Sequence, residues 1–501
     1  MYLNSKLIIG KNKDYEACII PKMVNRHGLI TGATGSGKTT TIKVLAESFS
    51  DAGIPVLMID VKGDVSGTCK EGTDEAWINS SVEQLGLEGF NYKKYPVAFY
   101  DVFKQSGIPL RTKLCDVNPR ILSKMLGLSD AQEGILAIAY QVSKDENLEL
   151  IDLDDLRQLL SYIGENKDKY ILAYGNITTA SVAAIQRNIL ELSQQGGDKF
   201  FGEPDFDLYD FMQYEYTGQG FINILDAQEL FKQPTLYACV LVWLLNNLYD
   251  KMPEVGDLDR PKLAVFLDEA HLIFSEMSGE LIKKITQIVK LIRSKGIGVY
   301  FISQVPNDIP EEILGQLGNK IQHVLRSYTP KDEQVIKASA DSFRQNPNFD
   351  TVETIKSLGI GEAIVSFLNE NGEPNVASKV KILPPQSYTK PISNDERDSI
   401  IKASRFYGKY ITDVDRHSAS EKVNEIREQA EVEKQQSIAA KEAEKQRILD
   451  EKEAEKLKKQ KEKEEEKRKK EQTKIVKQIG NKFVNKATTK VVNFIWKGLF
   501  K

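Results

Sequence analysis

A glycine-rich stretch early in the chain has the residue pattern of a phosphate-binding loop. It matches G-x-x-x-x-G-K-[ST] in full and reads Gly32, Ala33, Thr34, Gly35, Ser36, Gly37, Lys38, Thr39, followed by Thr40. Glycines let backbone N–H groups converge on phosphate oxygens, and a helix that starts at the loop adds partial positive charge. The loop is therefore predicted to bind a nucleoside triphosphate, with Lys38 on the β- and γ-phosphates and the Thr39 hydroxyl on Mg²⁺.

A pair of carboxylates follows an apolar run far downstream. Residues 263–267 read Leu-Ala-Val-Phe-Leu and lead directly into Asp268 and Glu269. Five consecutive apolar residues are typical of a strand that is covered on both faces. Together with the phosphate loop, this pattern predicts that Asp268 binds the magnesium shell and that Glu269 polarises the attacking water.

Two further strand ends carry polar side chains. Gln304 follows the apolar run 298–303, and the carboxyl end of a parallel strand faces the ligand crevice. A glutamine there can bond the γ-phosphate or the water, and a solvated loop amide is the alternative. The charged residues of the 60–64 segment either line the same crevice or form a polar turn.

Two arginines are candidates for the guanidinium that a neighbouring subunit directs at the γ-phosphate in ring-forming ATPases. Arg293 lies in a predicted helix, residues 285–295, before the Gln304 strand. Arg326 ends a predicted strand at 321–326. An ordinary surface or interface role is the alternative for each arginine, and the sequence does not choose between them.

The elements that must position these residues form an α/β pattern. Short apolar runs alternate with helical patterns up to about residue 385, which predicts a mainly parallel sheet. The predicted strands are 28–31, 55–60, 97–101, 221–225, 263–268, 298–303, 321–326 and 363–368. The expected organisation is a first core part (1–108), a helical insertion (109–216), a second core part (217–390), a charged helical spacer (391–472) and a basic amphipathic helix (473–501).

The charged spacer carries favourable i,i+4 pairs such as Glu455–Lys459 and Glu466–Lys470. Its apolar heptads are sparse, so a solvated charged helix is favoured over a coiled coil. Beyond it, apolar residues recur every fourth position from Ile475 to Ile495 among lysines, which is typical of a basic amphipathic helix.

Composition excludes several classes of protein. The chain has 501 residues and a formal net charge of −4, unlike a uniformly basic nucleic-acid binder. Its 4 cysteines form no C-x-x-C pair, which argues against a disulfide framework or a thiolate zinc site. Because no apolar stretch reaches about 18 residues, we expect a cytoplasmic protein. Peripheral membrane association through the terminal helix is the alternative.

The order of these motifs resembles the HerA/FtsK superfamily of P-loop ATPases. Five segments resemble the bacterial HerA-like ATPases more closely, namely residues 25–35, 60–64, 194–204, 291–300 and 308–319, and most of them lie outside the generic nucleotide motifs. The resemblance spans residues 21–385 and implies a RecA-like core of the additional-strand catalytic glutamate type. It also implies use of ATP and Mg²⁺, a homo-oligomeric and hexameric ring, and DNA-translocase or helicase ancestry. By the same resemblance, Lys38 and Thr39 take the Walker A roles, Asp268 and Glu269 the Walker B roles, and Gln304 the sensor position.

Two functions therefore remain open. The first is an ATP-driven motor that acts on DNA. The second is an ATPase switch or scaffold that docks on a membrane surface or a protein partner through its basic C-terminal helix. The same helix can instead grip DNA phosphates or pack onto the ring.

Overall fold

The computed structural model describes the backbone of residues 1–3, 5–276 and 279–496, and the side chains of these residues except 275–276 and 483–496. The chain divides into two compact units, Met1–Val423 and Asn424–Lys501.

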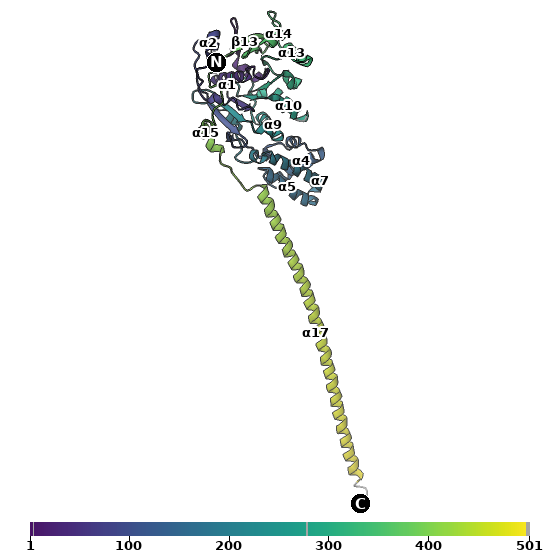
Figure 1. The fold of residues 1–501 in the computed structure, drawn as a ribbon. Helices are drawn as coiled ribbons and strands as arrows, with labels where there is room; N and C mark the ends of the chain where they lie inside the picture. Colours follow the sequence, from purple (N-terminus) through teal and green to yellow (C-terminus); the bar gives the residue numbers. More distant parts are fainter. Residues whose placement is uncertain (4, 277–278, 497–501) are drawn as a thin grey trace. The chain divides into compact units, whose positions relative to one another are not determined.

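One mixed sheet forms the core of the first unit (Figure 1). Its strands are β1 (Tyr2–Leu3), β2 (Lys6–Lys11), β3 (Glu16–Ile19), β4 (Gly28–Thr31), β5 (Val56–Asp60), β6 (Val97–Asp101), β7 (Ile108–Pro109), β8 (Ile222–Asp226), β9 (Leu263–Leu267), β10 (Ile297–Ser303), β11 (Asn319–Gln322), β12 (Glu362–Ser366) and β13 (Ser378–Ile382). They follow the order β1-β2-β13-β12-β11-β4-β10-β9-β5-β8-β6-β7, and β3 pairs with β2. The stretch from β11 to β7 is parallel, whereas β12, β13, β2, β3 and β1 pair antiparallel.

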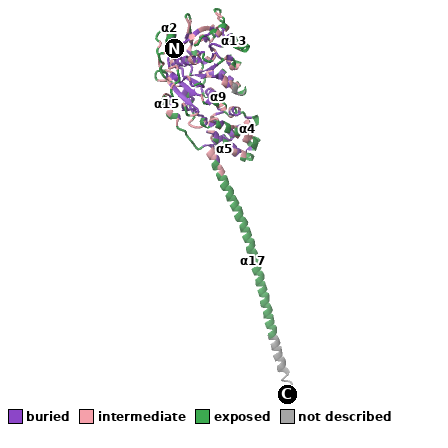
Figure 2. Cartoon of the chain, viewed as in Figure 1, coloured by how far each residue is buried: buried purple, intermediate pink, exposed green. Residues whose placement is uncertain are grey.

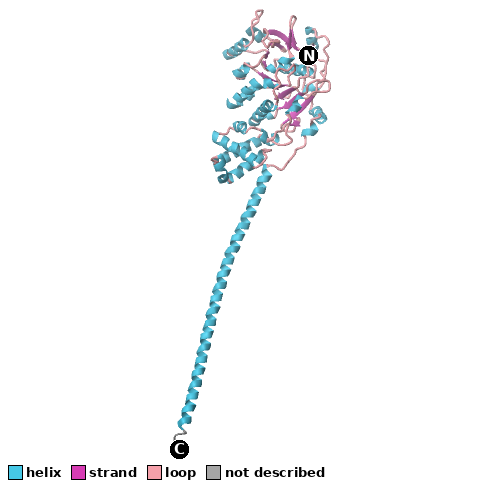
Figure 3. Cartoon of the chain, turned by 180° about the vertical axis from the view of Figure 1, so that it is seen from behind, coloured by secondary structure: helices cyan, strands magenta, loops and turns pink. Residues whose placement is uncertain are grey.

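The central strands are buried throughout because helices cover both faces of the sheet (Figures 2 and 3). The helices are α1 (Lys38–Asp51), α2 (Ala76–Leu85), α3 (Pro119–Met125), α4 (Asp130–Asp145), α5 (Leu153–Glu165), α6 (Lys167–Tyr174), α7 (Thr179–Gln194), α8 (Gly197–Phe200), α9 (Pro234–Lys251), α10 (Ala270–Glu276), α11 (Gly279–Leu291), α12 (Glu311–Leu314), α13 (Pro330–Asp341), α14 (Thr351–Ser357), α15 (Asn394–Ala403), α16 (Tyr407–Tyr410) and α17 (Ala419–Trp496). Helices α4, α5 and α7 pack on one another in the stretch between β7 and β8 (Figure 1). The predicted α/β fold with a mainly parallel central sheet is confirmed.

One predicted strand is wrong in its extent. The run 321–326 was expected to be a strand, but β11 covers Asn319–Gln322 and leaves Arg326 four residues beyond its end. Its parallel partner β4 stops at Thr31, where the chain turns into the glycine loop. The Val324 carbonyl consequently accepts a hydrogen bond from the Ala33 N–H of that loop at 2.9 Å, and the ladder ends there.

The segment 391–423, expected to begin the charged spacer, lies within the first compact unit. It carries α15 and α16, and the Arg397 guanidinium of α15 forms a buried ion pair with Asp226 at the end of β8. The same guanidinium lies 4.9 Å from the centroid of the Phe99 ring. These contacts explain why the chain stays on the core after its last strand.

The second unit begins within α17. Its described side chains are mostly exposed up to Lys482 (Figure 2), and the predicted pairs Glu455–Lys459 and Glu466–Lys470 form at 2.8 and 3.5 Å. The predicted amphipathic pattern from residue 483 onward lies outside the described side chains, and residues 497–501 lie outside the described backbone. Among the described residues, no helix combines the length and apolar character that a membrane span requires.

Candidate active site

The glycine loop connects β4 to α1 through backbone conformations that favour glycine. Gly32 has φ +154° and Gly37, directly before α1, has φ +105°. A Cβ atom on Gly32 would lie 2.5 Å from the Cβ of His323, and one on Gly37 would lie 3.1 Å from the nitrogen of Gly361. The loop therefore needs glycine at both positions for its shape and for the close approach of neighbouring chain.

Backbone hydrogen bonds from neighbouring segments fix the loop in place. The Gly32 N–H donates to the carbonyl of Gln304 at 3.1 Å, and the Gly361 N–H donates to the carbonyl of Ser36 at 3.1 Å. With the Ala33 bond to Val324, these contacts tie the loop to the chain that follows β10 and β11 and to the turn before β12. These hydrogen bonds hold the two ends of the loop, whereas Thr34 and Gly35 between them are exposed.

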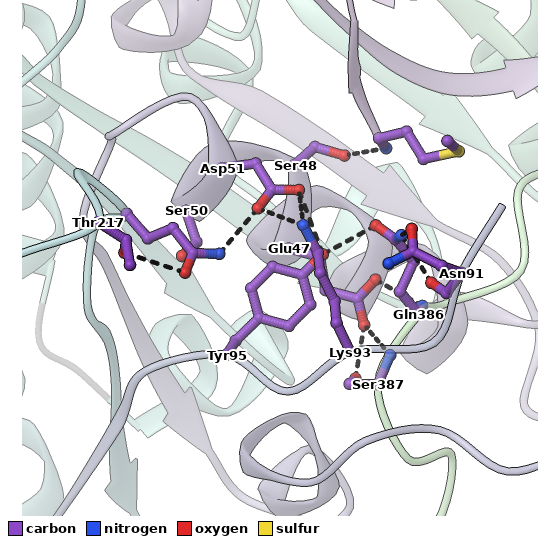
Figure 4. A network of polar contacts seen from close by, with 12 residues as sticks. Glu47, Ser48, Ser50, Asp51, Asn91, Lys93, Tyr95, Thr217, Gln386 and Ser387 are labelled. Carbon is purple, nitrogen blue, oxygen red and sulfur yellow. Dashed lines mark hydrogen bonds and ion pairs between the residues drawn. The ribbon is translucent and has the colours of Figure 1, made fainter. Parts of the chain in front are cut away.

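Helix α1, which begins with Lys38, is anchored by a buried polar network (Figure 4). The fully buried Glu47 carboxylate accepts hydrogen bonds from the N–H groups of Gln386 and Ser387, at 2.9 and 3.1 Å, and from the Ser387 hydroxyl at 2.5 Å. The ammonium of Lys43, one turn earlier, donates to the carbonyls of Tyr388 and Thr389. Burial raises the pKa of Glu47, and the three hydrogen bonds oppose that rise. The segment 386–389 thereby holds the helix that presents Lys38.

The Lys38 ammonium folds over the loop and donates to the carbonyls of Gly32 and Ala33. Burial lowers the pKa of Lys38, and the nearby Lys62 ammonium lowers it further. The Thr39 hydroxyl donates to Oδ2 of Asp64 at 2.8 Å. The loop lysine and hydroxyl therefore face the charged turn that follows β5.

The carboxylate pair reaches the same edge of the sheet through β9. Strand β10 lies between β4 and β9, and all three are parallel, so their carboxyl ends meet at one edge. Lys62 forms an ion pair with Oε1 of Glu269 and lies 4.0 Å from Oδ2 of Asp268. Burial raises the pKa of Asp268 to about 6, against the opposing charge of Lys62. The turn after β5 thus contacts the phosphate loop through Asp64 and the two carboxylates through Lys62.

The turn after β5 is an organised part of the site. Asp60 is buried and accepts hydrogen bonds from the N–H groups of Gly63 and Val65 at 2.8 and 3.4 Å. Burial raises the pKa of Asp60 to about 7, and the Asp64 carboxylate adds to the rise. The sequence left open whether this segment lines the crevice or forms a polar turn. The structure shows a polar turn that places Asp64 against Thr39 and Lys62 against the two carboxylates.

His323 is a residue of the site that the sequence did not single out. It is fully buried, with Nε2 at 2.9 Å from the Thr41 hydroxyl of α1 and Nδ1 at 2.9 Å from the Glu362 carbonyl. Burial lowers its pKa to about 4. A single histidine in a segment of mixed polar and apolar residues carried no signal for this role, because its partners are distant in sequence.

The remaining predicted residues are not all brought to the site. The Gln304 side chain is exposed at the end of β10, beside the loop, while its carbonyl holds Gly32. Arg326 is exposed beyond β11 on the same edge. Arg293 lies in a 3-10 turn (Ile292–Lys295) before β10, at the opposite edge of the sheet, and contacts Asp257 at 3.3 Å. The predicted helix 285–295 ends earlier, because α11 stops at Leu291.

The chain matches a known family over nearly its whole length. The sequence profile of the family described as "Helicase HerA-like C-terminal" matches residues 5–501. The chain belongs to this family. This HerA-like chain is 26% identical over 367 residues to the DNA double-strand break repair helicase HerA of Saccharolobus solfataricus, covering 72% of this chain and 64% of the relative. It is 24% identical over 362 residues to the DNA import protein CedB of Sulfolobus acidocaldarius, covering 70% and 52%.

The HerA-like chain spans less than two thirds of the length of these two relatives. Among solved structures, the bacterial conjugative coupling protein TrwBdeltaN70 matches with a TM-score of 0.50 at 14% identity, covering 79% of this chain and 92% of that one. That likeness shows the fold, a RecA-like P-loop core. The predicted family and the predicted RecA-like fold are both confirmed.

Proposed function

We propose that this HerA-like chain binds ATP with Mg²⁺ and hydrolyses it to ADP and phosphate. The observation that carries the proposal is the strand order β4-β10-β9, which brings Lys38, Thr39, Asp268 and Glu269 to one edge of the sheet. Strand β10 separates the phosphate loop from the acidic strand, and the proposed nucleotide binds between the loop and the two carboxylates. The family match supports the same activity.

The donor set fits a magnesium ion. Thr39, Asp64 and Asp268 offer only oxygen ligands, which Mg²⁺ prefers. The raised pKa of Asp268 shows a carboxylate whose charge the protein alone compensates poorly. In the proposed site, Thr39 and Asp268 hold the ion, and a bound Mg²⁺ neutralises charge on the terminal phosphates.

The chain's own residues have distinct tasks in the proposed hydrolysis. The loop N–H groups and Lys38 bind the β- and γ-phosphates. Glu269 accepts the proton of the attacking water, while the bond between the β–γ bridging oxygen and the γ-phosphorus breaks. Gln304, exposed beside the loop, orients the water or the γ-phosphate.

The test is the Lys38→Ala variant, with Lys169→Ala as the control. Lys169 is also a lysine whose ammonium donates a hydrogen bond, to Glu146 at 2.7 Å, but it lies in the helices between β7 and β8. We expect Lys38→Ala to abolish ATP turnover with an unchanged circular dichroism spectrum, and the control to retain wild-type turnover. Retained turnover in Lys38→Ala would refute the site.

We further propose that the chain works as a homo-oligomeric, ring-forming motor on DNA. The names of the relatives support this, since HerA is a DNA repair helicase and CedB a DNA import protein. Arg293 lies at the edge opposite the phosphate loop, so it reaches a γ-phosphate only on a neighbouring subunit. Arg326 is the second candidate.

Oligomer mass with and without an ATP analogue tests the ring. ATPase rates with and without single- and double-stranded DNA test the motor, on the full chain and on a chain ending at Val423, the boundary of the compact unit. Turnover that ignores DNA in both proteins would argue against a motor.

A second candidate function is an ATPase switch or scaffold that docks through the end of α17. Ile475, Val476 and Ile479 are exposed there beside Lys474 and Lys477, a combination suited to an anionic surface. Cosedimentation with anionic vesicles tests this function. It predicts that the full chain pellets with them, whereas the chain ending at Val423 stays in the supernatant.

A further inference from the structure

Lys62 holds the proposed catalytic carboxylate in the structure. Its ammonium is paired with Oε1 of Glu269, and Oε2 of the same carboxylate lies 3.2 Å from Nδ1 of His271. The Glu269 side chain is only 10% exposed, whereas the Lys62 side chain is 40% exposed. Glu269 is therefore enclosed, and its cationic partner retains room to move.

The backbone around Glu269 strengthens this contact. Glu269 has φ +48°, an uncommon conformation for a residue with a side chain, at the point where β9 ends and α10 begins. The carboxylate of this residue reaches the chain that follows β5, where it pairs with the Lys62 ammonium. A carboxylate held by an ammonium is a weaker proton acceptor, because the ion pair stabilises its charged form.

Lys62 is also close enough to the phosphate loop to affect it. Asp64, two residues further along the same turn, accepts a hydrogen bond from the Thr39 hydroxyl of the loop at 2.8 Å, and the Lys62 charge helps to lower the pKa of Lys38. Two neighbouring cations of this kind favour an additional anionic group between them. A lysine carries its charge on a flexible four-carbon stem, so Lys62 can exchange one anionic partner for another.

We infer that Lys62 is a γ-phosphate-sensing residue: its ammonium restrains Glu269 until a terminal phosphate takes over the ammonium, which frees Glu269 to accept the proton of water. The inference rests on the proposed ATPase function and adds a residue to it. ADP has no γ-phosphate, so Lys62 stays with Glu269 when ADP is bound. Because Lys62 leaves Glu269 only when a γ-phosphate is bound, Glu269 can accept a proton only when ATP is present.

The experiment compares binding of a fluorescent, non-hydrolysable ATP analogue with binding of the matching ADP analogue to the full chain. In Lys62→Met, we expect affinity for the ATP analogue to fall about tenfold and affinity for the ADP analogue to stay within about twofold. Lys62→Arg keeps the charge and should recover part of the preference for the ATP analogue. Lys169→Met, the matched ion-paired lysine away from the site, should leave both affinities unchanged.

Other outcomes overturn the inference in distinguishable ways. An equal loss of affinity for the ATP analogue and the ADP analogue in Lys62→Met would show that Lys62 only supports the fold of the site. An unchanged preference with faster ATP turnover would show that Lys62 restrains Glu269 without sensing phosphate. If the wild-type chain binds neither analogue, the proposed ATPase function fails, and the role of Lys62 fails with it.

Discussion

Removal of the Glu47 carboxylate tests how the phosphate-loop helix is held. In Glu47→Ala, the N–H groups of Gln386 and Ser387 and the Ser387 hydroxyl lose the acceptor that they share. An unpaired buried polar group costs about 1–3 kcal/mol, so three of them sum to about 3–9 kcal/mol. Removing a carboxylate whose burial is unfavourable offsets part of that sum, as its raised pKa indicates. We expect a net loss of about 3 kcal/mol in the free energy of unfolding.

The Glu47→Ala substitution should lower the stability of the whole first unit and also the local protection of residues 386–387. Urea unfolding can be followed by the fluorescence of Trp243, which is buried in the first unit. Hydrogen exchange at residues 386–387 should accelerate about 100-fold, the equivalent of about 3 kcal/mol at 1.4 kcal/mol per tenfold change. Glu353→Ala, which removes an exposed carboxylate 3.1 Å from Lys356, should change stability by less than about 0.5 kcal/mol. A Glu47→Ala protein as stable as this control would refute the anchoring role.

Three further predictions concern pH, the loop and the metal. Burial lowers the pKa of His27 to about 4. Below about pH 6.5 the histidine of the unfolded chain binds a proton that the folded chain does not bind, so the free energy of unfolding decreases as the pH decreases. Wild type should lose about 2 kcal/mol more than His27→Gln between pH 7 and pH 5 in urea unfolding, and equal losses would contradict the assignment. Gly32→Ala should weaken binding of a fluorescent ATP analogue at least about tenfold through its clash with His323, whereas Gly134→Ala, with open space around it, should not. EDTA should abolish turnover, MgCl₂ should restore it, and Thr39→Val should require about tenfold more MgCl₂; equal requirements would exclude the Thr39 hydroxyl as a ligand.

The sequence predicted most of the parallel part of the fold because most strands there are short apolar runs. Strand β7 was not predicted, and β11, which reads Asn-Lys-Ile-Gln, was predicted with the wrong extent. The strands 28–31 and 97–101 were predicted with the bounds that β4 and β6 have. The antiparallel strands β2, β3 and β13 were not predicted. Buried and partly exposed residues are mixed in β13, with lysines among the latter, so its sequence reads as polar. Such strands form because a neighbouring strand pairs with them, and the local sequence pattern does not show which strand that is.

The candidate site was predictable where a motif fixes the local geometry. Lys38, Thr39, Asp268 and Glu269 were found from the sequence, and the structure brings them to one edge; their catalytic roles stay predictions. The contact between Lys62 and Glu269 was not predictable, because it depends on β5 and β9 being neighbours. The positions of Arg293 and Arg326 relative to the phosphate loop could not be predicted either. They depend on where the neighbouring strands begin and end and on the direction in which those strands run.

The antiparallel strands have a consequence for protein engineering. The Leu383 N–H donates to the Ile9 carbonyl, the Ile382 N–H donates to the Gly361 carbonyl, and Gly361 in turn bonds Ser36 of the glycine loop. A series of main-chain hydrogen bonds therefore connects the antiparallel strands β2 and β13 to the glycine loop. A minimal fragment designed for crystallisation or inhibitor screening has to retain the first 27 residues, although the phosphate loop and the carboxylate pair lie after them.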